Sequence, residues 1–212
     1  MKKNPGWILF AVGWGFLLFG GSSGLEIVSA EEKSTGKEMR TGIIFETRAI
    51  DPDVFIRVEG AKKMVMVPVQ EWDYGVKLFT AKKWRQKAYD NAKYRRNAEA
   101  VADAVMESVK PELVRDSNGV VLYAMIRGED PFLSSILLSG KFLPQFKKTL
   151  GESVQVVILD RSLIYVFPVS GGRLDEFGAA LAEQYQATKQ PVSLEIFLVD
   201  KSGFKVIGNI ER

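Results

Sequence analysis

The order of hydrophobic and polar residues along the chain predicts short strands and three helices. Short apolar runs bounded by Gly, Pro, Asp and Asn are typical of strands, and apolar residues at spacings of three and four are typical of amphipathic helices. The predicted strands cover residues 43–47, 54–58, 64–69, 120–126, 154–159, 163–169, 193–199 and 204–207. The predicted helices cover residues 81–110, 131–150 and 174–187. The second of these helices is expected to kink at Gly140 or Pro144.

The lengths of two loops decide the fold class. Residues 160–162 and residues 200–203 each join two apolar runs. Connections this short produce antiparallel hairpins, whereas parallel strands need a long crossover. We therefore predict an α+β fold: a mixed, largely antiparallel sheet with about three helices packed on one face, formed by a single domain over residues 42–212.

The first thirty residues resemble a targeting segment. Lys2 and Lys3 precede an apolar run over residues 7–21, and small side chains lead to Ala30. This order is typical of a secretory signal peptide over residues 1–30. The alternative is an uncleaved membrane anchor, because residues 25–28 extend the apolar run toward the length that spans a bilayer. Both alternatives place the domain outside the cytoplasm, after a charged linker over residues 31–41.

Composition excludes several classes of chemistry. The chain has no cysteine and no histidine, which rules out Ser-His-Asp catalysis, thiol nucleophiles, and thiolate or imidazole metal sites. The 29 basic and 26 acidic residues leave a net charge of only +3, which does not by itself indicate nucleic-acid binding. We expect no cofactor, no resident metal and no nucleic-acid partner.

The clearest candidate site is a cluster of basic residues in the first half of the helix predicted over residues 81–110. Asp90 is the one acid between residues 82 and 96, against seven bases: Lys82, Lys83, Arg85, Lys87, Lys93, Arg95 and Arg96. Positive charge at a helix N-terminus opposes the macrodipole. Either an anionic partner or acidic neighbours such as Glu71 and Asp73 would offset it. The candidate partner-binding residues are Arg85, Lys87, Lys93, Arg95 and Arg96, with Tyr89 and Tyr94 between them.

Three other patterns leave enzymatic alternatives open. Ser34 and Lys37 have the spacing of serine-lysine acyl enzymes, although they lie in the predicted linker. Glycines 171 and 172 precede a predicted helix, where backbone amides can bind an anion. Four carboxylates lie at the ends of predicted strands and loops and could form an acid/base pair or a cation site: Glu129, Asp130, Asp160 and Asp175. Asp130 and Pro131 also fit a helix start, and residues 160–162 fit a simple hairpin turn.

The last 130 or so residues resemble the C-terminal part of the YtpQ-like family of bacterial proteins, whose biochemical role is unknown. The matching features are Trp84, Arg127, Asp130, Phe132, Ser135, Leu138, Pro191, Phe197, Gly203 and the apolar runs at 154–159 and 163–169. The chain departs from the family at Leu159 and Ser162, where the family tends to have proline and aspartate, and in its export-like leader. The resemblance implies a fold rather than an activity.

These patterns favour an exported, non-catalytic binding or accessory module of the cell envelope, with an anionic envelope component or an acidic protein as its partner. The alternative is an envelope hydrolase that uses carboxylates or a serine-lysine pair. Two acids within hydrogen-bonding reach of one solvent-filled cleft would favour the hydrolase. A third possibility is a structural subunit that pairs with a partner strand along residues 64–69. Membrane contact is expected only through residues 1–30, if they are not cleaved.

Overall fold

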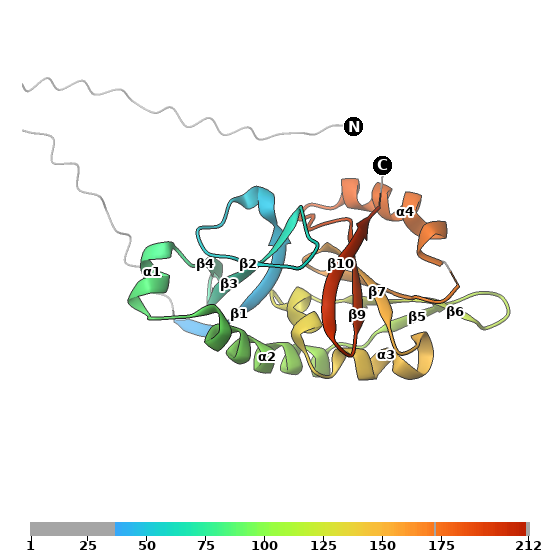
Figure 1. Cartoon of the computed structure of the whole chain (residues 1–212), viewed down its shortest axis with the longest axis horizontal. Coiled ribbons are helices and arrows are strands. Elements are labelled where there is room, and N and C mark those ends of the chain that lie inside the picture. Colours follow the sequence, from blue (N-terminus) through green and yellow to red (C-terminus); the bar gives the residue numbers. More distant parts are fainter. Residues whose placement is uncertain (1–36, 172, 211–212) are drawn as a thin grey trace, which may run out of the picture. The chain divides into compact units, whose positions relative to one another are not determined.

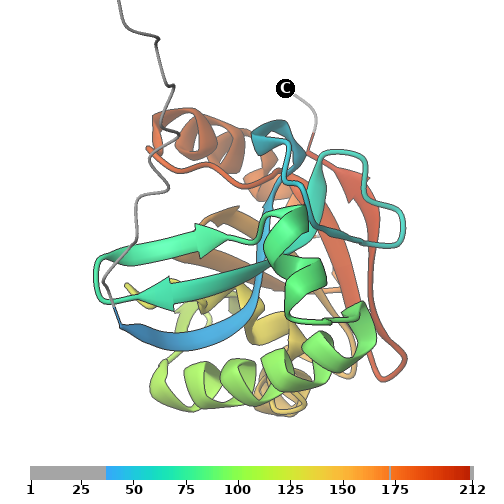
Figure 2. The ribbon, with the colours of Figure 1, turned by 90° about the vertical axis from the view of Figure 1, so that its left-hand side faces the viewer.

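The computed structural model describes residues 37–171 and 173–210, which belong to one compact unit (Figure 1). Its first sheet has four strands in which β3 is central. β1 pairs along one side of β3, and β2 and β4 pair along different parts of its other side, all antiparallel. The bounds are β1 Glu38–Thr47, β2 Ile56–Arg57, β3 Met64–Trp72 and β4 Gly75–Leu78. Figure 2 looks onto this sheet and the helix that follows it.

The second sheet has six strands in the order β10-β9-β7-β8-β6-β5, and every neighbouring pair is antiparallel. The bounds are β5 Glu112–Arg115, β6 Val121–Arg127, β7 Val154–Asp160, β8 Leu163–Pro168, β9 Glu195–Asp200 and β10 Gly203–Asn209. The predicted hairpins around residues 160–162 and 200–203 are confirmed as β7–β8 and β9–β10.

The described residues form four α-helices and two short 3₁₀ segments. These are η1 Arg48–Ile50, α1 Ala81–Gln86, α2 Asn91–Ser108, η2 Leu133–Leu138, α3 Phe142–Leu150 and α4 Arg173–Ala187. Figure 1 shows α2 and α3 along one side of the strands and α4 along the other. The predicted helix over residues 131–150 is interrupted between η2 and α3, at Gly140, whereas Pro144 lies inside the first turn of α3, where its missing N–H is not needed.

The α+β class is confirmed, but the arrangement differs from the prediction in four ways. The described residues form two sheets rather than one, and all the strand pairs in them are antiparallel rather than mixed. Helices cover both faces of the second sheet, because α3 contacts β6 and β7 while α4 contacts β7 and β8. Strand β1 begins at Glu38, inside the linker predicted over residues 31–41.

Strand β3 is not available for strand addition. It runs through Pro68 to Trp72 and pairs with β1 on one side and with β2 and β4 on the other, which weakens the third possibility of a partner strand along residues 64–69. Pro68 is tolerated because β2 ends its pairing at Met66 and β4 begins its pairing at Val69. The missing N–H of Pro68 therefore faces neither strand.

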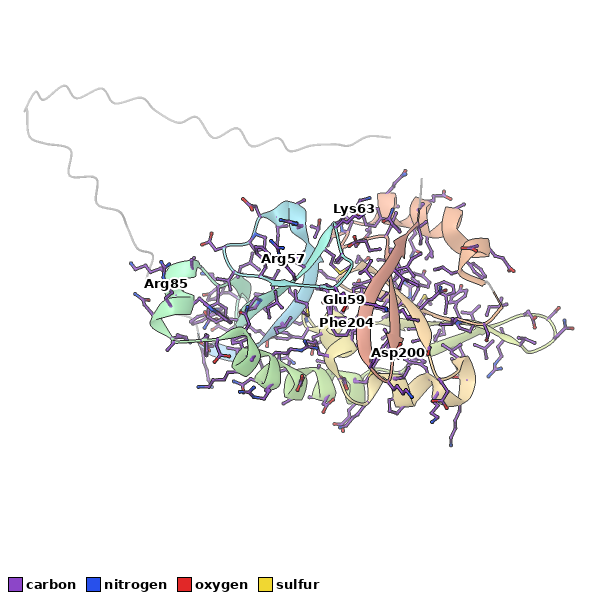
Figure 3. All side chains as sticks on the ribbon, viewed as in Figure 1. Arg57, Glu59, Lys63, Arg85, Asp200 and Phe204 are labelled. Atoms are coloured by element: carbon purple, nitrogen blue, oxygen red, sulfur yellow. The ribbon has the colours of Figure 1, made fainter. Side chains whose placement is uncertain are left out.

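The loop between β2 and β3 is hydrogen-bonded to β9 and β10 of the second sheet. The Val206 N–H of β10 donates to Glu59 O at 2.8 Å, and Figure 3 shows Glu59 beside Phe204. The carboxylate of Glu195, which is 3% exposed, accepts from the Lys62 and Lys63 N–H groups at 2.7 and 3.0 Å. These bonds fasten a loop of the first sheet to β9 and β10.

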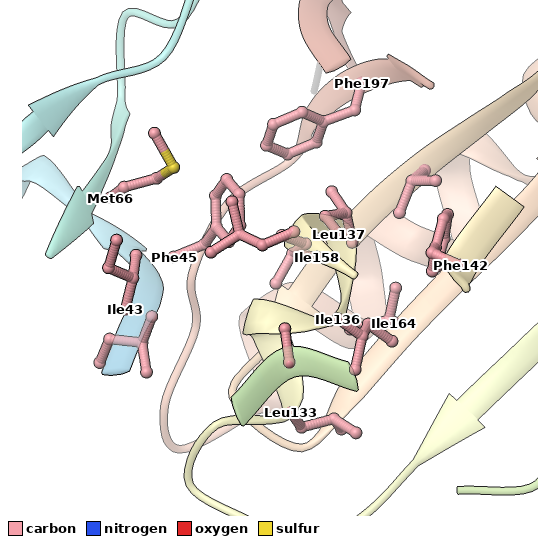
Figure 4. Close-up of a cluster of buried hydrophobic side chains, with 14 of the residues drawn as sticks. Ile43, Phe45, Met66, Leu133, Ile136, Leu137, Phe142, Ile158, Ile164 and Phe197 are labelled. Atoms are coloured by element: carbon pink, nitrogen blue, oxygen red, sulfur yellow. The ribbon is translucent and has the colours of Figure 1, made fainter. Parts of the chain in front are cut away.

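The two sheets share one hydrophobic core, shown in part in Figure 4. Phe45 of β1 is fully buried and makes edge-to-face contacts with Phe197 of β9 and Phe204 of β10, at centroid distances of 5.4 and 5.5 Å. Alternate side chains of β7 and β8 point to the other face of the second sheet and form a smaller core under α4, which includes Val157 and Phe167. Strands β7 and β8 are thus apolar at nearly every position because both faces of the sheet are covered there.

Among the described residues, no helix is both long and apolar enough to cross a membrane. The predicted signal peptide or anchor over residues 1–30 lies outside them.

Candidate functional site

The basic cluster lies on two helices rather than one. The predicted helix over residues 81–110 is broken after α1, where Ala88 adopts a φ of 50°, and α2 restarts at Asn91. The Asp90 carboxylate caps the new helix by accepting from the Lys93 N–H at 2.7 Å. Thr80 caps α1 in the same way through the Lys83 N–H. Asp90 therefore offsets part of the unfavourable interaction between the bases and the α2 dipole.

Aromatic side chains fix the corner between α1 and α2. Phe79, Trp84, Tyr89 and Tyr94 pack together at centroid distances of 4.9 to 5.6 Å. Tyr94 is buried and donates its hydroxyl to Val69 O at 2.8 Å, and burial raises the pKa of Tyr94 above its usual value. Tyr89 and Tyr94 are consequently part of the packing beneath the corner.

The structure separates the five predicted partner-binding residues into two groups. Lys87 pairs with Glu38 at 3.2 Å, and Arg95 lies 3.8 Å from Glu99 and over the Phe204 ring. Arg85, Lys93 and Arg96 are exposed, and none of them contacts an acid within the part of the chain that the structure describes. Figure 3 shows Arg85 on α1, at the end of the molecule far from Asp200. We call Arg85, Lys93 and Arg96 the basic corner.

The expected acidic neighbours do not balance this corner. Glu71 binds Arg40 of β1 instead, through contacts of 2.6 and 3.2 Å, and Asp73 is exposed at the turn between β3 and β4. The positive charge of the basic corner is therefore directed to solvent.

A cleft of about 310 Å³ beside β1 and the β7–β8 turn contains the candidate carboxylates Glu129 and Asp130 together with Glu71. Sequence reasoning did not foresee that Arg40 binds two of them: its guanidinium donates to Asp130 at 3.0 and 3.1 Å as well as to Glu71. The hydrogen bond to Glu71, assisted by Asp130, raises the pKa of Arg40, which therefore stays charged. Asp130 also accepts from the Phe132 N–H at 2.8 Å, but it does not cap a helix as predicted, because the 3₁₀ segment η2 begins at Leu133 with Phe132 as its N-cap and without a side-chain cap bond.

The other two candidate carboxylates, Asp160 and Asp175, do not line this cleft. Asp160 accepts from the Ser162 N–H and from the Thr188 hydroxyl, each at 2.7 Å, which fits the simple hairpin-turn alternative. Asp175 lines a different groove, of about 580 Å³, between α4 and the end of β10. Within residues 37–171 and 173–210, no group of three or more acidic side chains has the geometry to hold a metal ion.

Two predicted motifs fall partly outside the described residues. Ser34 of the serine-lysine pair lies outside them, and only Lys37, which is exposed, is described. Of the two glycines before α4, Gly171 is described and Gly172 is not. Both motifs stay predictions.

No protein-family model, curated protein or solved structure matches this chain. The resemblance to the YtpQ-like family therefore stays a prediction.

Proposed function

We propose that the protein is a non-catalytic binding or accessory module of the cell envelope that engages an anionic partner through the basic corner. The observation that carries this proposal is that Arg85, Lys93 and Arg96 are exposed around a rigid aromatic cluster and pair with no acid among the described residues. Unpaired positive charge on a fixed scaffold attracts anions and contributes to association rate and selectivity. The leader predicted over residues 1–30 supports a location outside the cytoplasm.

The hydrolase alternative is supported less well. Acids do share the cleft beside β1, as that alternative requires, but Glu71 and Asp130 both accept hydrogen bonds from Arg40. An acid/base pair needs one carboxyl group that can donate a proton to a substrate and one that can take a proton away. Carboxylates already hydrogen-bonded to a guanidinium are poorly suited to both roles. Glu129 therefore has no second available carboxyl group among the described residues of this cleft with which to form an acid/base pair.

Charge reversal at the basic corner tests the proposal. The full chain, held in a non-ionic detergent, is titrated with inorganic polyphosphate, and the affinity is compared with that of the variant Arg85→Glu/Lys93→Glu/Arg96→Glu. A basic residue near an anionic surface contributes about 1 kcal/mol, so we expect the variant to bind at least tenfold more weakly, one factor of ten being about 1.4 kcal/mol. The Lys93→Glu change suits the first turn of α2, because acidic residues are favourable there.

The matched control makes the same change in net charge elsewhere: Lys110→Glu/Lys148→Glu/Lys189→Glu. These three lysines are exposed and lie outside the corner. Circular dichroism establishes that both triple variants fold. The proposal requires the control to keep most of its affinity. Equal losses in the two variants would mean that only net charge matters, and the basic corner would not be a binding site.

A further inference from the structure

Exposed apolar side chains gather at the end of the molecule that carries α1. Met39 of β1 is 60% exposed, Tyr74 of the β3–β4 turn is 50% exposed, and Leu78 at the end of β4 is 37% exposed. Tyr74 stacks against Trp72 at a centroid distance of 6.0 Å and has the Lys77 ammonium over its ring at 4.7 Å. A half-exposed tyrosine of this kind is typical of the aromatic side chains that lie at a membrane interface.

The same end carries an excess of positive charge. Helix α1 follows β4 directly and presents exposed lysines and an arginine, and Lys87 reaches back to Glu38 at the start of β1. Figure 2 faces this end, with the β3–β4 hairpin and α1 both toward the viewer. Among the acids nearby, Glu38 is paired with Lys87 and Asp53 accepts from the Ala81 N–H. Asp73 is exposed, and Asp90 caps α2. We call this surface the hairpin end; it comprises Met39, Tyr74, Lys77, Leu78, Lys83 and Arg85.

The path of the chain connects the hairpin end to the apolar segment at the N-terminus. Lys37 O accepts from the Asp73 N–H at 3.3 Å, so the chain joins the described fold beside the β3–β4 turn. Eight residues, 29–36, separate Lys37 from the end of the apolar run at residue 28. A chain of this length reaches at most about 30 Å. If the apolar run stays in a bilayer, the hairpin end is tethered close to that bilayer.

We propose that the hairpin end docks on an anionic phospholipid surface, with Tyr74 and Met39 at the headgroup boundary and Lys83 and Arg85 against the lipid phosphates. This inference rests on the proposed function, because it names lipid headgroups as the anionic partner. Charge and apolar area act together: basic residues draw the surface to anionic lipid, and the apolar side chains gain from leaving water. A soluble polyanion would interact with the basic residues alone.

The absence of cysteine from the chain allows a site-specific test. An environment-sensitive dye is attached to the full chain at Asp73→Cys, beside Tyr74, and in a second sample at Asn118→Cys, on the β5–β6 turn. Both positions are exposed. Each labelled protein is reconstituted into vesicles of neutral phosphatidylcholine or of phosphatidylcholine mixed with phosphatidylglycerol. The apolar N-terminal run is common to all samples, so differences report only on the folded part.

The proposal predicts a blue shift of the dye at position 73 in the anionic vesicles, little shift in neutral vesicles and none at position 118. Adding Lys83→Glu/Arg85→Glu should abolish the shift, and adding Met39→Ser/Tyr74→Ser should reduce it while polyphosphate affinity stays unchanged. No shift at position 73, or equal shifts at positions 73 and 118, would overturn the proposal. Should the shift be absent while the basic corner still governs polyphosphate affinity, the proposed function stands with a non-lipid partner; if both fail, both are wrong.

Discussion

Replacing Phe45 by alanine is expected to destabilise the protein by about 3–5 kcal/mol, the range for deleting a fully buried phenylalanine ring. Phe45 lies where the two sheets meet, against Phe197 and Phe204 of the second sheet. Its loss opens a cavity between two elements that cannot easily close on it, and it also removes two edge-to-face ring contacts. Urea unfolding followed by tryptophan fluorescence measures the change in the free energy of unfolding.

Two companion variants control this prediction. Ile207→Ala removes a side chain that is 48% exposed on β10, and we expect a change within about 0.5 kcal/mol. Phe45→Leu keeps most of the volume and should be less destabilising than Phe45→Ala, so it provides a measurable value even if the alanine variant does not fold. A loss below about 1 kcal/mol for Phe45→Ala would show that the sheets do not share this core.

The second large effect is expected at the ion pair between Glu46 and Arg161. Glu46 of β1 is 2% exposed, and its carboxylate accepts from Arg161 Nε at 2.7 Å, across 115 residues of sequence. Arg161→Ala leaves this carboxylate buried without its cation. Because the Arg161 side chain is partly exposed, water can enter the space that it leaves, and we expect a loss of about 2–3 kcal/mol, below the range for a fully buried pair. Denaturant unfolding of the wild type and the variant at pH 7 gives the difference.

Neutralising the acid of this pair should destabilise the protein less than removing the arginine. Arg161 has a side chain that is 42% exposed, so water can solvate its guanidinium when Glu46→Gln removes the negative charge. We therefore expect Glu46→Gln to destabilise the protein by less than half as much as Arg161→Ala, and the double variant to show coupling between the two sites. The opposite order would contradict the assignment of Glu46 as the more buried partner.

The strands that follow short loops were predictable from local sequence. Residues 160–162 and 200–203 are too short for anything but hairpins, and β7–β8 and β9–β10 have that form. The uninterrupted apolar runs of β7 and β8 also indicated a sheet that is covered on both faces, whereas we predicted helices on one face only. Alternate side chains such as Ile158 and Val157 belong to different cores, which requires cover on both faces of the sheet.

The break between α1 and α2 was predictable in principle. Trp84 and Ala88 continue a helical spacing, which favours one long helix, yet Asp90 followed by Asn91 is a helix-start signal. The aromatic packing of Tyr89 and Tyr94 under Phe79 then determines the outcome, because it requires the chain to turn. Such tertiary contacts override a periodicity that is compatible with either form.

The candidate site was predictable in its residues but not in their pairing. The exposed bases could be identified from the run between residues 82 and 96, whereas the partners of Lys87 and Arg95 depend on the fold. The same holds for Arg40, which binds Glu71 and Asp130 at sequence separations of 31 and 90 residues. Local spacing carries no information on contacts at that range.

The account depends most on the claim that the folded domain works outside the cytoplasm. A direct test fuses alkaline phosphatase, an enzyme that needs disulfides and is therefore active only beyond the reducing cytoplasm, to the end of the chain after residue 212 in a bacterial host. The account predicts phosphatase activity from intact cells that is lost when residues 2–30 are deleted. An inactive fusion, together with a fluorescent cytoplasmic reporter at the same position, would contradict it.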